Sequence, residues 1–302
     1  MNWRSWRELR PVQTEHNGFE RLAMRVLFAL VVWRHIPGSL DHLEISAPNG
    51  LARWVDQGFL LDPQIFAWCK YALAVACALY VLRIGWSVAL PYMALLSISV
   101  GTLINSTGAI AHYLQIVSLV LATQTAAHLY SLFAERGVAH STWRAEAENR
   151  VIFWSQQAIV ATYVVSAFTK LLRTSGMWFF QSPLIAVQIV KTNDQEFYNR
   201  LETESYGVGL ATAEWMVQHP LLTGLVLSTG LLLELAAPVA LFGRWYAAGL
   251  GLALVLFHTS VHQVMKLNFL YNEYLIWIYL VNVPFWILLA LRAVQRRRSA
   301  PG

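Results

Sequence analysis

The sequence contains little charge. Only 13% of its 302 residues are Asp, Glu, Lys or Arg, whereas 57% are hydrophobic. Soluble domains usually carry about 25% charged residues, and a chain with this little charge would expose too much apolar surface to water. The composition therefore excludes an ordinary soluble protein. Because apolar runs recur from end to end, it favours a single membrane domain over residues 1–302.

Cysteine is also scarce, and a leader sequence is not apparent. Cys69 and Cys77 are the only two cysteines. Eight residues of helix separate them by about 12 Å, which is too far for a disulfide. Residues 1–18 contain no apolar core with a small-residue cleavage site, so no signal peptide is expected. The basic residues lie near predicted helix ends and form no basic face, so no nucleic-acid partner is expected.

Long apolar runs are abundant instead. A helix needs about 20 residues to cross a bilayer, and the candidate spans are 21–37, 65–83, 86–104, 109–133, 151–172, 220–243, 246–265 and 270–292. The first is the weakest, because it contains Arg21, Arg25 and Arg34. The stretch 177–219 predicts an outer-side interfacial or re-entrant segment. The expected fold is an all-α, polytopic transmembrane helix bundle of about eight spans.

The distribution of positive charge predicts the orientation of this bundle. With both termini in the cytoplasm, 14 of the 22 Lys and Arg residues fall on the inner side, as the positive-inside rule requires. The basic tail 293–302 is then cytoplasmic, and the long segments 38–64 and 173–219 lie outside. The expected location is a cell membrane, which is the inner membrane if the source is bacterial.

Ionisable side chains inside the predicted spans need a reason, because each costs roughly 2.5–3.5 kcal/mol there. Lys170 near the end of YVVSAFTKLL either extends to the outer headgroups or faces a buried cavity, where a neutral amine acts as a general base. Glu234 lies mid-span and is either protonated or paired with a lysine or histidine of a neighbouring span. Pro238, four residues later, is expected to kink that helix.

Histidines form the second group of polar residues. His258 and His262 lie on one helix face at a spacing of four. Such a pair can bind a metal, but the other histidines lack matching spacing, so hydrogen bonding or proton handling is favoured and no metal is expected. His112, Lys170, His262 and Lys266 all fall in the outer half of the predicted bundle. Their common depth predicts one pocket open to the outer side, and the segment TSGMWFFQSPLIAVQIV would be either its lid or an interfacial anchor.

Three stretches resemble the HTTM (horizontally transferred transmembrane) family, which is related to the membrane domain of vitamin K-dependent gamma-carboxylase. They are YVVSAFTKLLRTSGMW, GLLLELAAPVALFG and LVLFHTSVHQVMKLNFLYNEYL. The family has a Tyr-rich helix that ends in Lys-Leu before a Trp, then a helix with Leu-Leu-Leu and an acidic residue, then a Phe-His helix. The order and intervals of these motifs agree over 150–292.

The resemblance implies roles for individual residues. Lys170 matches the base that deprotonates a vitamin K-like quinol, Glu234 matches the acidic residue and His258 matches the histidine after Phe. His112 aligns with a histidine that assists carboxylation, which is a lyase-type reaction. The animal carboxylase continues into a large lumenal region that holds its protein substrate, and no counterpart is expected here after the last span. A protein or peptide substrate would therefore have to bind without such a docking domain, and a smaller one fits better.

Two classes of function fit these observations. The first is a membrane enzyme acting on a lipid-soluble quinol-type cofactor. Its catalytic residues would be Lys170, His258, His262 and His112, and its cofactor-binding residues would be Glu234, Trp178 and Asn268. The second is a non-catalytic small-molecule or proton-coupled transporter, or an accessory subunit of membrane redox chemistry, since ion pathways also use such residues. No interrupted helices occur at matching positions in two halves, which weakly disfavours transport.

Overall fold

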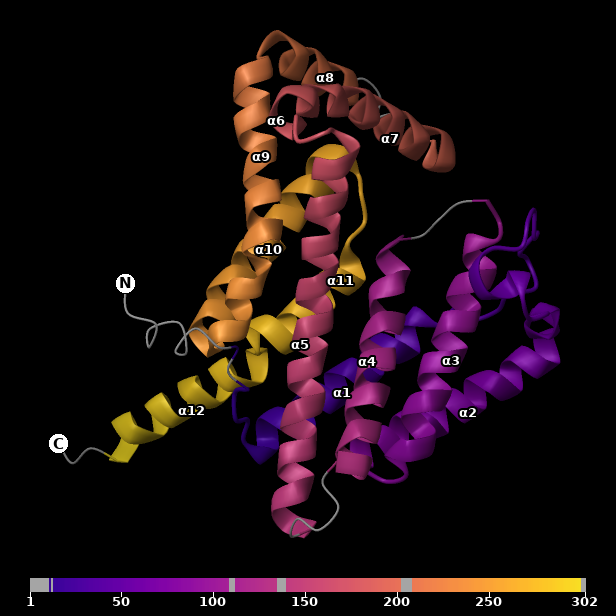
Figure 1. Cartoon of the computed structure of the whole chain (residues 1–302), viewed down its shortest axis with the longest axis vertical. Coiled ribbons are helices and arrows are strands. Elements are labelled where there is room, and N and C mark those ends of the chain that lie inside the picture. The colour runs from indigo at the N-terminus through magenta and orange to yellow at the C-terminus, as the bar shows by residue number, and fades with distance from the viewer. Residues whose placement is uncertain (1–10, 12, 109–111, 135–139, 202–207, 300–302) are drawn as a thin grey trace.

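The fold is a bundle of helices. The computed structural model describes residue 11 and residues 13–108, 112–134, 140–201 and 208–299, and within these ranges it contains helices and turns but no strand (Figure 1). The all-α fold predicted from the sequence is therefore confirmed.

The main helices are α1 (Gly18–His35), α2 (Pro63–Leu82), α3 (Trp86–Asn105), α4 (His112–Ala134), α5 (His140–Arg173), α9 (Pro220–Ala236), α10 (Arg244–Met265), α11 (Leu270–Leu275) and α12 (Val283–Ser299). Between α5 and α9 lie four shorter elements, α6 (Trp178–Gln181), η4 (Ser182–Leu184), α7 (Ile185–Arg200) and α8 (Val208–Gln218). The loop after α1 contains η2 (Gly50–Arg53) and η3 (Gly58–Leu61), α9 continues into η6 (Ala237–Phe242), and α11 continues into the π-helical turn η7 (Ile276–Val281).

Six described helices are long and apolar enough to cross a membrane: α2, α3, α4, α5, α9 with η6, and α10. A seventh crossing results if Leu270–Val281 and Val283–Gln295 count as one span bent by 48°. Asn282 lies at this bend in the left-handed region with φ 57°. The remaining expected span, 21–37, corresponds to α1, whose 18 residues include Glu20 and three arginines. The protein is thus an integral membrane protein with six or seven apolar crossings, slightly fewer than the expected eight.

Local sequence explains where several helices begin and end. Pro63 occupies the first turn of α2, and the side chain of Asp62 accepts hydrogen bonds from the backbone N–H groups of Gln64 and Ile65. Pro238 has no N–H to donate to the carbonyl of Glu234. The helix accordingly tightens into the 3₁₀ turn η6, where the N–H of Ala237 reaches that carbonyl. The kink expected at Pro238 is therefore a change of helix type.

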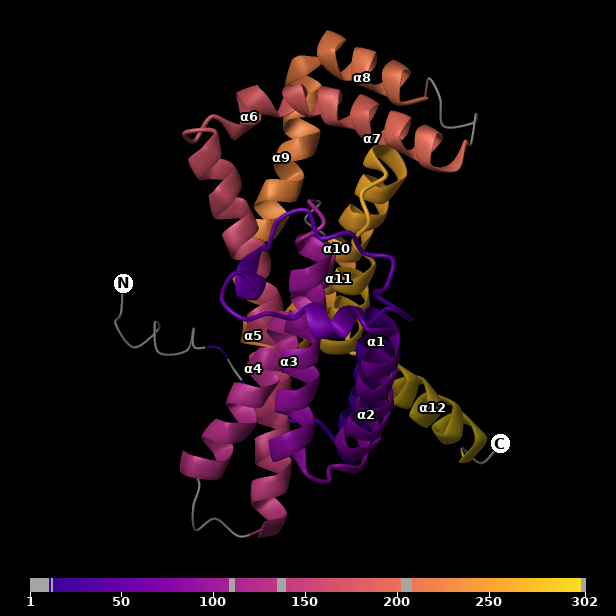
Figure 2. The same ribbon diagram turned by 90° about the vertical axis from the view of Figure 1, so that its right-hand side faces the viewer.

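The helices form two groups around α5, which runs the full height of the bundle (Figures 1 and 2). Helices α2 to α4 lie on one side of α5, α9 and α10 lie on the other, and α1 crosses behind α5. The elements α6, α7 and α8 form a layer across one end, as expected for an interfacial segment at 177–219 (Figure 2). Leu73, Leu121, Ile159 and Tyr279 are among the fully buried side chains of the core.

A buried carboxylate ties α1, α2 and α5 together near the opposite end of the bundle. The side chain of Glu148 is only 3% exposed, and its carboxylate lies 2.8 to 3.1 Å from nitrogens of Arg21, Arg25 and Arg83. The nitrogens of Arg25 and Arg83 also donate to the backbone carbonyls of Val81 and Arg144. Arg21 and Arg25, two of the three arginines that weaken α1 as a span, therefore hold it against its neighbours.

Candidate functional site

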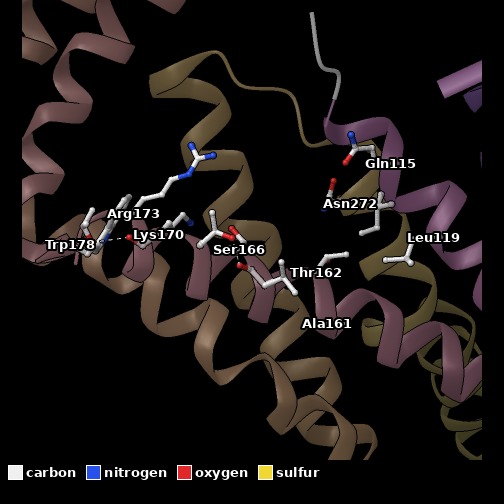
Figure 3. A pocket seen from close by; sticks show the side chains of 13 residues that line it. Gln115, Leu119, Ala161, Thr162, Ser166, Lys170, Arg173, Trp178 and Asn272 are labelled. Atoms are coloured by element: carbon white, nitrogen blue, oxygen red, sulfur yellow. Dashed lines mark hydrogen bonds between the residues drawn. The ribbon is translucent and has the colours of Figure 1, made fainter. Parts of the chain in front are cut away.

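A polar stripe on the second half of α5 forms one wall of a cavity. Thr162, Ser166, Thr169 and Arg173 recur at intervals of three or four residues and Lys170 is next to Thr169, which places all five on one side of the helix. The cavity has a volume of about 870 Å³ and lies between α4, α5, α6 and α11 (Figure 3). Its lining residues are Gln115, Ile116, Leu119, Ala161, Thr162, Val165, Ser166, Thr169, Lys170, Arg173, Thr174, Trp178 and Asn272.

An ion pair between α5 and α9 lies at this wall. The Nζ atom of Lys170 lies 2.5 and 2.6 Å from the two carboxylate oxygens of Glu234. The hydroxyl of Ser166, one turn earlier on α5, donates to one of these oxygens at 3.2 Å. The side chain of Glu234 is 6% exposed and that of Lys170 is 28% exposed. The carboxylate is therefore buried behind the amine, and Lys170 is the member of the pair that lines the cavity.

Trp178 lines the cavity beyond the end of α5. The ring of Trp178 lies 5.6 Å from the Nζ atom of Lys170. The chain reaches this position through a tight turn, in which Ser175 and Gly176 have φ of 51° and 79° and the N–H of Gly176 donates to the carbonyl of Leu171. Glycine commonly follows a helix in this left-handed conformation. The indole N–H of Trp178 is buried and has no hydrogen-bond partner within the described residues.

His258 lies in the bundle core, outside the set of residues that line the cavity. Its side chain is buried, and its Nε2 atom lies 2.7 Å from the hydroxyl of Tyr163 on α5. The ring of Phe269 packs against it with centroids 4.5 Å apart. Its Nδ1 atom is buried and finds no partner in the part of the chain that the structure describes. Tyr163 is one turn before Ser166 on α5, so the pair lies close to the polar stripe.

The other expected site residues lie elsewhere. His262 is exposed, and its Nδ1 atom lies 3.0 Å from the carbonyl of Leu267, beyond the end of α10. Asn268 is also exposed, and its side chain caps α11 by accepting from the N–H of Leu270 at 2.9 Å. Neither residue lines the cavity. His112 begins α4, and its side chain lies outside the described residues. Of the expected residues, Lys170 and Trp178 therefore line the cavity, and Glu234 is paired with Lys170 behind the cavity wall.

Sequence reasoning passed over Tyr163, Ser166 and Arg173. Each is separated from the next member of the α5 stripe by three or four residues, so the helical spacing of polar residues around Lys170 was the available signal. Gln115 on α4 and Asn272 on α11 face each other across the far end of the cavity (Figure 3). The set contains hydroxyls, amides and cations. In the described ranges no three His, Cys, Asp or Glu side chains gather as a metal site would require.

The cavity is open to the outside of the bundle. Leu119 and Val165 line its apolar part and are 42% and 63% exposed. Both belong to helices long and apolar enough to cross a membrane. A lipid-soluble molecule could therefore enter from the bilayer without passing through water.

Comparisons with known proteins do not identify a relative. No known family model matches this chain, and neither a curated protein nor a solved structure shows significant similarity to it.

Proposed function

We propose that this protein is a membrane-embedded enzyme that deprotonates a lipid-soluble, quinol-type molecule, with Lys170 as the base. One observation carries the proposal: the amine of Lys170 lies at the wall of an open cavity with a buried carboxylate directly behind it. A catalytic base needs a proton-accepting atom that the substrate can reach and a partner that stabilises the protonated form. The pair of Lys170 and Glu234 meets both requirements.

Each residue of the pair has a distinct task in this scheme. The proton that Lys170 holds in the ion pair first passes to the Glu234 carboxylate, which leaves a neutral amine. This amine accepts the proton of a quinol hydroxyl, and loss of the carboxyl proton then restores the ion pair with Glu234. Ser166 donates to that carboxylate and keeps it in place. The ring of Trp178 lines the cavity 5.6 Å from the Lys170 amine and offers an aromatic surface against which the quinol ring can pack. His258 and Tyr163 support α5 from behind, and no proton transfer is assigned to His262.

The resemblance to the HTTM family supports the same assignment. In the related carboxylase, the lysine of the Lys-Leu pair deprotonates vitamin K hydroquinone, and Lys170-Leu171 occupies the matching position here. A vitamin K-type quinol is therefore the first compound to test, with carboxylation of a small second substrate as the coupled reaction. The charge pattern also supports an orientation with both termini in the cytoplasm and the α6–α8 layer outside, which requires α1 and the bent pair to cross the membrane in addition to the six long apolar helices.

The experiment measures quinol consumption by the full-length protein in nanodiscs in the presence of oxygen, with absorbance as the readout. Lys170→Ala should lower the rate by about 100-fold or more, because a positioned base contributes at least that factor. Lys170→Arg keeps the charge but should be equally inactive, since a guanidinium does not give up its proton. Lys266→Ala removes an exposed lysine away from the cavity and should retain the wild-type rate. Normal turnover in folded Lys170→Ala would refute the proposal.

A transporter would give a different result with the same variants. If wild-type protein consumes no quinol, but proteoliposomes move protons or a small solute in a manner that depends on Lys170, the protein is a carrier and the enzyme proposal is wrong. Mass spectrometry of lipid-soluble molecules that copurify with wild-type protein and with Lys170→Ala identifies the compound in either case.

A further inference from the structure

We infer that the cavity also binds the phosphate group of an anionic membrane lipid, with Arg173 as the residue that contacts the phosphate. This lipid would occupy the same cavity as the proposed quinol. The inference rests on the proposed function only in that both ligands use this cavity.

Among the described residues that line the cavity, one cation has no anionic partner. The charge of Lys170 is matched by Glu234 at 2.5 Å. Arg173, one turn further along α5, also lines the cavity but has no carboxylate partner among the described residues. In Figure 3 its guanidinium extends beside Lys170 on the same side of α5. The cavity wall therefore carries an unmatched positive charge, and a bound anion would neutralise it.

The position of Arg173 in the fold selects a lipid as the source of this anion. Arg173 is the last residue of α5, where an apolar span ends and lipid headgroups are expected to begin. A guanidinium matches a phosphate group with two parallel hydrogen bonds, which is a common mode of phosphate recognition.

The rest of the cavity suits an acyl chain. Ile116, Leu119, Ala161 and Val165 line its apolar part, and Leu119 and Val165 are 42% and 63% exposed. A lipid whose phosphate lies on Arg173 can therefore place one chain along these residues and leave the other in the bilayer. The apolar lining together with a cationic rim fits an amphiphile better than a free inorganic anion.

The test is lipid retention by the full-length protein, measured by native mass spectrometry after release from phosphatidylcholine vesicles that contain phosphatidate. We expect one saturable phosphatidate per protein, and a loss of affinity of about tenfold or more in Arg173→Gln, because a charge-assisted, two-point contact is removed. Arg53→Gln is the matched control. Arg53 is exposed in the loop before α2, away from the cavity, and this variant should bind as the wild type does.

Three results would overturn the inference. Equal retention by Arg173→Gln and wild type would exclude Arg173 as the contact. Equal retention of diacylglycerol with the same acyl chains would exclude the phosphate. Displacement of the lipid by inorganic phosphate at comparable concentration would show that the acyl chain takes no part. Binding is read without quinol turnover, so phosphatidate retention by an inactive protein would support the lipid site while the proposed enzyme activity failed.

Discussion

The amine of Lys170 and the carboxylate of Glu234 join two helices 64 residues apart in the sequence, with distances of 2.5 and 2.6 Å to the two carboxylate oxygens. Two charged groups inside a bundle each lose hydration, and only a close partner offsets that cost. The pair therefore contributes to the packing of α5 against α9 as well as to the chemistry of the cavity. The contributions of the pair to stability and to activity can be separated by substituting the two residues one at a time.

Glu234→Gln should destabilise the protein by about 1–3 kcal/mol. Removing one partner of a fully buried pair costs about 3–5 kcal/mol, and the 28% exposure of the Lys170 side chain reduces that cost. Thermal unfolding in detergent measures the change. Glu214→Gln, an exposed position on α8, is the control and should have little effect. In the double variant Lys170→Met/Glu234→Gln, part of the lost stability should be recovered, because no charge is left unpaired. A double variant as unstable as the sum of both changes would argue against coupling.

Glu148→Gln should have a larger effect, on the order of 3–5 kcal/mol, because three arginines lose their common carboxylate. Their side chains are only 12% to 28% exposed, so water replaces the lost partner poorly. Glu146→Gln changes an exposed neighbour on the same helix and should leave the unfolding temperature nearly unchanged. Similar melting of the two variants would mean that this cluster contributes little to the docking of α1.

Gly224→Ala should destabilise the contact between α9 and α6 by about 1–3 kcal/mol, the usual cost of overpacking. An added Cβ atom at Gly224 would lie 2.8 Å from the backbone carbonyl oxygen of Phe179, so the α6 backbone must move. Since Phe179 follows Trp178, quinol turnover should fall as well. Gly249→Ala is the matched control, because its Cβ would meet nothing within 4 Å and alanine favours a helix. Equal stability of the two variants would show that α6 shifts freely.

The sequence alone predicted the helical class and the approximate limits of most spans, because bilayer thickness imposes long apolar runs that are visible in any such chain. It did not predict which polar residues meet. Glu234 was expected to be protonated or paired. Its actual partner depends on how α9 packs against α5, and the spacing of residues within one helix does not indicate which other helix it contacts. His258 and His262 share a helix face, yet one turn separates a buried position from the exposed last turn of α10. Depth within the bundle, rather than spacing, separates these two environments.

Tyr163→Phe tests whether His258 has a supporting role. The substitution removes the hydroxyl 2.7 Å from Nε2 of His258, leaving a buried ring without that hydrogen bond. An unsatisfied buried polar group costs about 1–3 kcal/mol, so the unfolding temperature should fall. Quinol turnover should fall less than in Lys170→Ala, because neither residue lines the cavity. Tyr71→Phe, at a position 67% exposed, is the control.

Replacing both groups in Tyr163→Phe/His258→Phe should restore much of the stability, since no buried polar atom is then left alone. If turnover in the single variant falls as far as in Lys170→Ala, the tyrosine and histidine take part in the chemistry, and the supporting role is wrong.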